Sequence, residues 1–180
     1  MGLPHYIERV VNQAETNGAS IIIFEIDTFG GRVDAATQIK DIILDSKIPT
    51  VAFINKRAIS AGALISLSCD SIYMTSGASI GAATAVSLDG KKASEKVISY
   101  MREEMATTAE ANNKSREIAS AMVDEELYIE YFLSASGDTI TASDVEGFKE
   151  GKLITLSTNL ALKLGIADGK FNTKEDLLSG

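Results

Sequence analysis

The sequence contains very little cysteine and proline, which excludes several large classes of protein. Of its 180 residues, one is cysteine and two are proline. The single cysteine, Cys69, cannot form an intramolecular disulfide, and its apolar neighbours predict a small buried core residue. The scarcity of proline, together with a hydrophobic content of 45%, excludes a linker or a disordered tail and predicts an ordered globular chain.

Positive charge is also scarce, because acidic residues outnumber basic ones and the formal net charge at pH 7 is -8. Nucleic acids and anionic membrane surfaces are bound through basic patches, so neither is expected as a partner. No apolar run is long enough for a membrane-spanning helix, and residues 1–18 show no signal-peptide pattern. The absence of a GxGxxG or P-loop pattern disfavours a bound nucleotide.

Histidine is reduced to a single residue, His5. A serine nucleophile is usually activated by a histidine that an aspartate orients. His5 precedes the first expected strand and is typical of an exposed helix residue, so it is a poor candidate for that base. Lysine is the known alternative, provided that burial or cationic neighbours keep its amine neutral.

The hydrophobic pattern predicts one α/β domain that spans residues 1–180. Helical spacing of apolar residues alternates with continuous β-branched runs, which are typical of buried parallel strands. Connections between such strands are expected to be right-handed. The expected helices cover residues 6–17, 33–45, 61–67, 95–111, 116–122 and 158–164, and the expected core strands cover residues 21–26, 49–54, 70–74 and 166–169.

A protruding β-arm is expected outside this core. Residues 127–133 and 144–155 are predicted to be two strands of a hairpin around Ser136-Gly137-Asp138. Residues 55–59 are expected to form a polar loop, and residues 79–93 a looser segment rich in small side chains. Ser115 and Ser157 are predicted to cap the helices that follow them, and Gly165 to end the second of these.

Ser60 lies at the corner between the strand and loop of residues 50–59 and the small-residue helix of residues 61–67. A serine at a strand-to-helix corner exposes its hydroxyl, and its backbone lies at the positive end of the helix. Serine is also a preferred helix N-cap. The local sequence therefore leaves two interpretations of Ser60 open, a nucleophile and a cap.

Two further features could complete a serine site. Lys96 begins the long helix of residues 95–111, where the helix dipole disfavours a cation, although spacing alone does not select it over Lys92. Gly30 and Gly31 follow the first strand, and the N–H of Gly31 could hold an oxyanion together with the N–H of Ala61. The same glycine pair could equally form an ordinary strand-to-helix turn or a phosphate-binding loop.

Several segments resemble motifs of the ClpP/SppA class of serine proteases. They are Asp27-Thr28-Phe29-Gly30-Gly31, which is similar to the Asp-Thr-Pro-Gly-Gly turn, Ala58-Ile59-Ser60-Ala61-Gly62, which is similar to the nucleophile turn, and Ser79-Ile80-Gly81-Ala82. Residues 94–100, 121–124, 151–156 and 161–168 extend the resemblance, over nearly the whole chain, to the protease domain of NfeD-type membrane-bound ClpP-class proteases. Phe29 replaces the proline of the family pattern, which leaves both glycines intact.

This resemblance implies a ClpP/crotonase-like fold of stacked ββα units and an endopeptidase with a Ser–Lys dyad. Ser60 would be the nucleophile and Lys96 the general base, with the N–H groups of Gly31 and Ala61 as oxyanion donors. No metal or cofactor is expected. The implied substrates are hydrophobic segments of membrane-associated proteins, with a stomatin-like protein as partner, and the β-arm suggests a homo-oligomer.

Proteases of this type also carry a signal peptide and a C-terminal membrane region with a small β-barrel domain. We therefore expect this chain to be part of a longer, membrane-associated protein, with the protease domain on the extracytoplasmic side. Two other functions fit the same fold. A crotonase-type acyl-CoA enzyme would use the two N–H donors without the pair Ser60–Lys96, and an assembly module would keep the fold without turnover.

Overall fold

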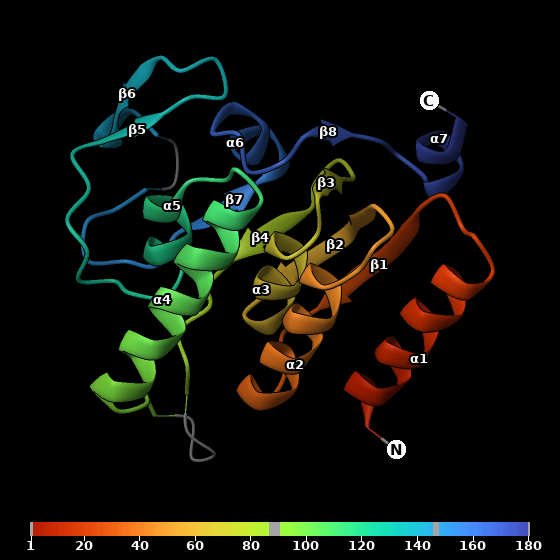
Figure 1. Cartoon of the computed structure of the whole chain (residues 1–180). Coiled ribbons are helices and arrows are strands. Elements are labelled where there is room, and N and C mark those ends of the chain that lie inside the picture. The colour runs from red at the N-terminus through yellow and green to blue at the C-terminus, as the bar shows by residue number, and fades with distance from the viewer. Residues whose placement is uncertain (1, 87–90, 146–147, 180) are drawn as a thin grey trace.

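The computed structural model describes residues 2–86, 91–145 and 148–179. Helices and strands alternate through the first half of the chain, and shorter elements follow (Figure 1). In chain order they are α1 (Leu3–Thr16), β1 (Ile22–Thr28), α2 (Val33–Leu44), β2 (Thr50–Ile59), α3 (Ala61–Leu67), β3 (Ser71–Met74), β4 (Ser79–Gly81), α4 (Glu95–Ala111), α5 (Arg116–Ala121), β5 (Tyr131–Leu133), β6 (Thr139–Thr141), the 3-10 helix η1 (Ala142–Asp144), β7 (Thr155–Ser157), α6 (Thr158–Lys163), β8 (Gly169–Lys170) and α7 (Lys174–Ser179).

Strand β2 is the centre of the sheet. β1 lies along one side of it, and β3 and β4 lie along the other, against its first and second halves, all in parallel. β8 extends the sheet beside β3 in parallel, and β7 extends it beside β4 in antiparallel orientation. Within the described residues these six strands form one sheet, which confirms the predicted α/β architecture.

The expectation of a polar loop over residues 55–59 is wrong, because β2 continues to Ile59. The polar residues of this stretch pair with β1 across the sheet. Asn55 donates to the Glu25 carboxylate at 2.9 Å, and Arg57 forms an ion pair with Asp27 at 3.0 Å. β1 is accordingly an edge strand with Glu25 exposed, not a strand buried on both faces.

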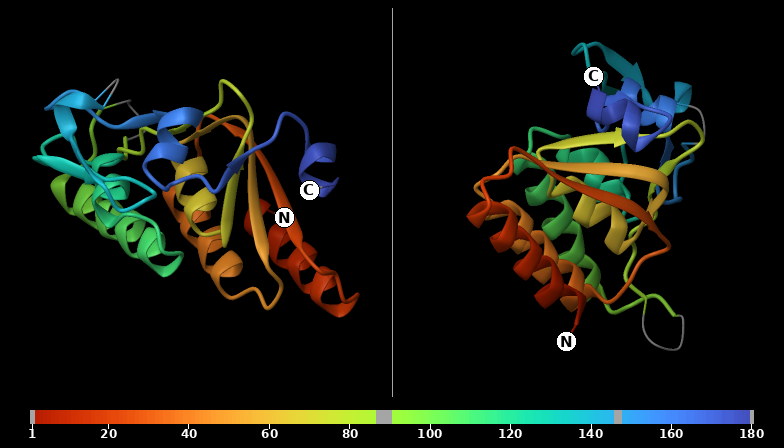
Figure 2. Two further views of the ribbon diagram at one scale, coloured as in Figure 1. Left: turned by 90° about the horizontal axis from the view of Figure 1, so that it is seen from above. Right: turned by 90° about the vertical axis from the view of Figure 1, so that its right-hand side faces the viewer.

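Helices α1 to α4 lie side by side on one side of the sheet (Figures 1 and 2). Each presents an apolar stripe to the sheet or to its neighbours, and α3 is buried along nearly its whole length. The core that results includes fully buried Phe53, Leu64 and Ile72. Cys69 is also fully buried, as predicted, and burial raises the pKa of its thiol to about 12.

The arm differs from the prediction. β5 pairs with β6 in antiparallel orientation, and the Ser134 hydroxyl accepts a hydrogen bond from the Asp138 N–H at 2.9 Å within the turn. The expected strand over residues 144–155 is wrong for the described residues of that range, among which only Thr155 is a strand residue, and it begins β7 in the main sheet. Residues 146–147 of this expected strand lie outside the described residues. Residues 79–81 form β4 instead of starting a loose segment, because they pair with both β2 and β7.

The local signals at helix ends are confirmed. The hydroxyls of Ser115 and Ser157 accept hydrogen bonds from the N–H groups of Ile118 and Leu160 and so cap α5 and α6. Gly165 follows α6 with a φ of +69°. His5 is exposed in α1, as expected. In the described part of the chain, no helix has both the length and the apolar character to cross a bilayer.

Candidate active site

Ser60 joins the end of β2 to the start of α3, as predicted. Its N–H donates to the Gly81 carbonyl of β4 at 3.0 Å, and its own carbonyl accepts from the Ala63 N–H at 2.9 Å. The backbone is therefore held from the sheet on one side and from the helix on the other. The serine has a φ of 56° and a ψ of -116°, a conformation that side-chain-bearing residues rarely adopt.

The Ser60 hydroxyl makes no capping hydrogen bond to α3, so the interpretation of Ser60 as a side-chain cap is wrong. Backbone strain of this kind costs about 1–3 kcal/mol and persists only where the surroundings enforce it. The strained conformation leaves the hydroxyl without a hydrogen-bond partner among the described residues. Both observations are typical of a positioned nucleophile rather than of a helix cap.

The loop that follows β1 packs directly on this corner. A Cβ at Gly30 would lie 2.8 Å from the Ser60 Cβ and 3.3 Å from its Oγ, and Gly30 has a φ of +124°. A Cβ at Gly62, the second residue of α3, would lie 2.6 Å from the Thr28 Cγ2. Only glycine fits at both positions, so the glycines set how closely the two turns approach each other.

Two backbone amides beside Ser60 have no hydrogen-bond partner among the described residues. The N–H of Gly30 donates to the Thr28 hydroxyl at 3.1 Å, but those of Gly31 and Ala61 donate to no described residue. The Ala61 amide is free because it is in the first turn of α3. A Cβ at Gly31 would lie 3.9 Å from the Ala61 Cβ, which places the two predicted oxyanion donors on adjoining turns.

The structure does not bring Lys96 into contact with Ser60. Lys96 is the second residue of α4, and its side chain is exposed rather than buried. It makes no hydrogen bond or ion pair with any residue that the structure describes, and the Ser60 hydroxyl is no exception. Helix α4 does pack on α3, so the two residues belong to neighbouring elements.

Lys92, the alternative that the sequence left open, is engaged elsewhere. Its amine lies 3.1 Å from the Glu125 carboxylate and 3.8 Å from that of Glu126. The hydrogen bond to Glu125 raises the pKa of the Lys92 amine. A lysine with a raised pKa is a poorer general base at neutral pH, which counts against Lys92 as the base.

The segments that precede α4 and follow α5 are tied together, which the sequence did not indicate. The Ala83 N–H donates to the Met122 carbonyl at 2.6 Å, and the Thr84 hydroxyl donates to the Val123 carbonyl. Arg102 of α4 also pairs with the largely buried Asp124. These contacts join sequence-distant segments, so no local pattern could have revealed them.

Phe29, where the family pattern has proline, is exposed over 75% of its surface. The Arg57 guanidinium lies 4.5 Å from the centre of its ring, and the same Arg57 pairs with Asp27. A cation over an aromatic ring contributes about 0.5–1 kcal/mol at an exposed site. This contact, also missed from the sequence, restrains the loop in front of Gly30.

In the described part of the chain, no three or more histidine, cysteine, aspartate and glutamate side chains gather where they could hold a metal ion. A cavity of about 1060 Å³ lies elsewhere in the molecule, and none of the predicted site residues line it.

Comparison with solved structures defines the class of this fold. The 1510-N domain of a membrane-bound stomatin-specific protease, solved as a lysine-to-alanine variant with a substrate peptide, matches with a TM-score of 0.76 and 26% identity over 98% of this chain and 72% of that one. ClpP1 from Listeria monocytogenes matches with a TM-score of 0.65 and 20% identity over 97% of this chain and 87% of that one. The fold is ClpP-like, as the resemblance implied.

The chain belongs to the family of NfeD1b N-terminal domains, whose model matches residues 1–180. It is 38% identical to the membrane protein NfeD1b of Bacillus subtilis over 168 residues, and 33% identical to the membrane-bound protease PH1510 of Pyrococcus horikoshii over 128 residues. These matches cover 93% and 67% of this chain. The chain spans about a third of each relative, 35% and 29%.

Proposed function

We propose that this domain is a serine endopeptidase in which Ser60 is the nucleophile and Lys96 the general base. The observation that carries the proposal is the Ser60 corner itself. Its strained backbone exposes a hydroxyl without a hydrogen-bond partner among the described residues, and Gly30 packs against it so closely that no side chain fits. The unengaged amides of Gly31 and Ala61 lie on the two turns that meet there.

The residues can then act in sequence. The neutral Lys96 amine takes the proton of Ser60 while its oxygen attacks the scissile carbonyl. The amides of Gly31 and Ala61 stabilise the tetrahedral oxyanion, and removing one such donor costs about 2.7–4 kcal/mol in the barrier. Lys96 then protonates the leaving amine and activates the water that releases the acyl-enzyme.

This mechanism requires the Lys96 amine to come within about 2.6–3.2 Å of the Ser60 hydroxyl. Catalytic hydrogen bonds are often long in a free enzyme and tighten only when substrate binds. Lys96 has no competing partner among the described residues and lies in the first turn of a helix packed on α3. Solved variants of the related 1510-N domain replace a lysine or a serine by alanine, which supports a mechanism that uses both residue types.

The substrates and setting are proposed from the relatives. The archaeal relative is named as specific for stomatin, and we propose hydrophobic segments of membrane-associated, stomatin-like proteins as substrates and partners here. Both curated relatives are named as membrane proteins, so we place the full-length protein at the membrane with this domain on the extracytoplasmic side. A homo-oligomer of at least two copies completes the proposal.

A covalent serine probe tests the dyad. We expect a fluorophosphonate to label Ser60 and a hydrophobic peptide substrate to be cleaved. Ser60→Ala and Lys96→Ala should each lower kcat by about 10⁴-fold or more, as for the members of other nucleophile–base units. Lys92→Ala is the matched control and should change kcat less than about twofold, because the Lys92 amine forms an ion pair with Glu125. A neutral amine base also predicts that kcat/KM rises with pH.

The two other functions give different outcomes. Tight binding of coenzyme A in calorimetry, without labelling of Ser60, would identify an acyl-CoA enzyme and overturn the proposal. Retention of full activity in Lys96→Ala would overturn the role of Lys96 while leaving Ser60 as nucleophile. A properly folded protein with neither labelling, cleavage nor coenzyme A binding would point to an assembly module.

A further inference from the structure

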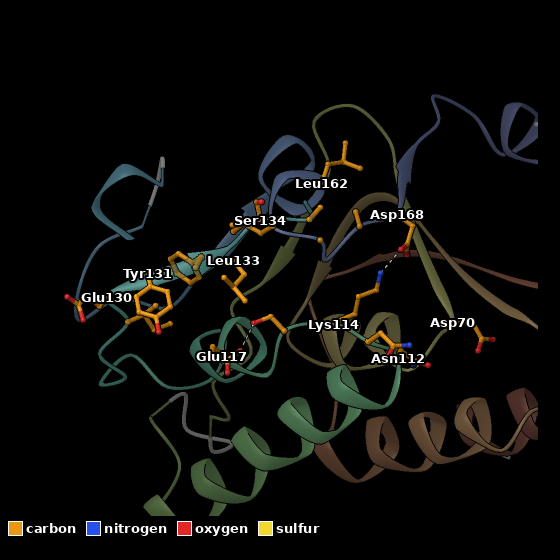
Figure 3. Close-up of a pocket in the computed structure, with 18 of the residues that line it drawn as sticks. Asp70, Asn112, Lys114, Glu117, Glu130, Tyr131, Leu133, Ser134, Leu162 and Asp168 are labelled. Carbon is orange, nitrogen blue, oxygen red and sulfur yellow. Dashed lines mark hydrogen bonds and ion pairs between the residues drawn. The ribbon is translucent and has the colours of Figure 1, made fainter. Parts of the chain in front are cut away.

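The cavity of about 1060 Å³ lies between the arm and the connection from α4 to α5 (Figure 3). Its volume is slightly above the range of about 300–1,000 Å³ that small-molecule pockets occupy. Tyr131 and Leu133 of β5 line one side of it, and Lys114 and Glu117 line another. It contains no residue of the proposed dyad, so it has to be explained separately.

One wall of this cavity is an unpaired strand edge. Among the described residues β5 pairs with β6 alone. The register makes Phe132 and Ile140 a hydrogen-bonded pair, flanked by the bonds from the Ser134 N–H to the Asp138 carbonyl and from the Ala142 N–H to the Glu130 carbonyl. Because antiparallel pairs alternate, the backbone groups of Tyr131 and Leu133 point away from β6. No described residue forms a backbone hydrogen bond with either.

The side chains on this edge also alternate. Phe132 is buried and forms an edge-to-face contact with Phe148, with 5.3 Å between ring centres. Tyr131 and Leu133 project from the opposite face with 57% and 58% of their surfaces exposed, and nearby Tyr128 is exposed over 73%. If another strand were added beside β5, every second one of its side chains would therefore contact the apolar surface of Tyr131 and Leu133.

The lining of the cavity is acidic. Asp70, Glu117, Glu130 and Asp168 contribute carboxylates, and Lys114 is the only basic residue among the lining side chains. Lys114 is committed to Asp168 at 2.6 Å, with 6% of its side chain exposed, as Figure 3 shows. The Glu130 carboxylate forms no hydrogen bond or ion pair with a described residue, and the backbone carbonyl of Glu130 accepts from the Ala142 N–H. Incoming basic side chains would thus find carboxylates that lack a cationic partner.

We propose that the outer edge of β5 and this cavity bind an extended polypeptide segment with alternating apolar and basic side chains. The segment adds a strand to β5, its apolar side chains contact Tyr131 and Leu133, and its basic side chains face Glu117 and Glu130. A second copy of this chain fits less well, because it carries a net charge of -8 and would bring the same carboxylates to the contact. The proposal is independent of peptidase activity.

The test uses the Ser60→Ala protein, so that binding is measured without cleavage. The probe is a fluorescein-labelled octapeptide of alternating valine and lysine, and its matched control alternates valine and glutamate. In fluorescence anisotropy we expect the lysine peptide to bind at least tenfold more tightly than the glutamate peptide. The difference should shrink as salt is raised, since screening weakens the attraction between exposed charges.

A pair of proline variants separates edge pairing from other contacts. Leu133→Pro removes an N–H on the cavity edge of the arm, and Thr139→Pro removes the equivalent N–H on the opposite edge, because Leu133 and Thr139 are directly opposed. Neither N–H bonds to a described residue, so both variants should fold. We expect Leu133→Pro to weaken the lysine peptide at least tenfold and Thr139→Pro less than twofold.

A charge variant gives a second readout that does not depend on the backbone of the arm. Glu130→Lys, at an exposed position, should weaken the lysine peptide at least fivefold and tighten the glutamate peptide. Equal binding of the lysine peptide by the wild-type arm and by Leu133→Pro would overturn the proposal. Analytical ultracentrifugation gives a second way to overturn it. The proposal fails if the chain self-associates, if Leu133→Pro abolishes this self-association, and if the lysine peptide does not compete with it.

Discussion

At the scale of single residues, the two glycines beside Ser60 are more restrictive than the serine itself. A serine side chain accepts many environments, whereas a Cβ at Gly30 or Gly62 would overlap atoms at 2.8 Å and 2.6 Å. The backbone of Ser60 has to take a conformation that costs stability, and the close approach of the glycine turns helps to maintain it. The cost is therefore concentrated where the proposed chemistry occurs.

Gly30→Ala tests this close approach. The new methyl group would press on Ser60, so we expect kcat to fall at least about 100-fold, as small misplacements of reacting groups do. Unfolding free energy should fall by about 1–3 kcal/mol. Gly77→Ala is the matched control, because Gly77 also has a positive φ, +79°, but a Cβ there meets no atom within 4 Å. It should cost some stability and leave kcat unchanged, and an equal loss of activity in both variants would contradict the argument.

At the scale of elements, serine plays two different parts at helix starts. Ser115→Ala and Ser157→Ala remove observed caps and should each lower the unfolding free energy by about 1 kcal/mol. Ser60→Ala removes no cap and should lower it less. Ser60→Gly should raise it by about 1–2 kcal/mol, because glycine tolerates the positive φ, while abolishing activity. Urea denaturation measures all four, and a loss in Ser60→Ala equal to that in Ser157→Ala would restore the cap interpretation.

Elements that depend on residues close together in the sequence were predicted correctly, and elements that depend on distant residues were not. The bounds of α4 and the caps at Ser115 and Ser157 were predictable, because helix periodicity and capping depend on a few neighbouring residues. β4 and β7 were not, because both are three-residue strands that exist through pairing with sequence-distant partners. The polar end of β2 resembles a loop in sequence for the same reason, because its side chains pair with those of β1.

The residues of the candidate site also fall into a group that local sequence predicts and a group that depends on distant segments. Ser60, Gly31 and Ala61 lie in short motifs at strand ends, so their neighbourhood could be anticipated from topology. The relation of Lys96 to Ser60 depends on how α4 is oriented on α3, which no local pattern encodes. The carbonyl of Gly81 that fixes Ser60, and the contact between Arg57 and Phe29, also need the register of neighbouring strands.

At the scale of the whole molecule, one ion pair ties the last helix to the first strand. Lys174 of α7 lies 2.8 Å from the Glu25 carboxylate of β1. The hydrogen bond from Lys174, with a further one from Asn55, lowers the pKa of Glu25 below its ordinary value of 4.5. The stabilisation from this carboxylate is therefore present above about pH 4.5 and is lost as the pH falls through the lowered pKa.

We expect the amides of α7 to exchange with solvent faster at pH 3 than at pH 6, after correction for intrinsic rates, while those of β2 remain protected. Glu25→Gln should show the faster α7 exchange already at pH 6, because the charge is absent at both values. NMR hydrogen exchange measures both proteins. An α7 whose exchange in the wild type does not depend on pH would show that the ion pair has no role in holding it.

The ties between Ala83 and Met122, and between Thr84 and Val123, bring the chain back to its point of departure from the sheet. Everything between them, α4 and α5 included, is an excursion closed at its base. The strands on either side keep their register whatever the excursion contains. These ties fix where the excursion leaves and rejoins the rest of the fold, whereas the position of Lys96 within it depends on how α4 packs on α3.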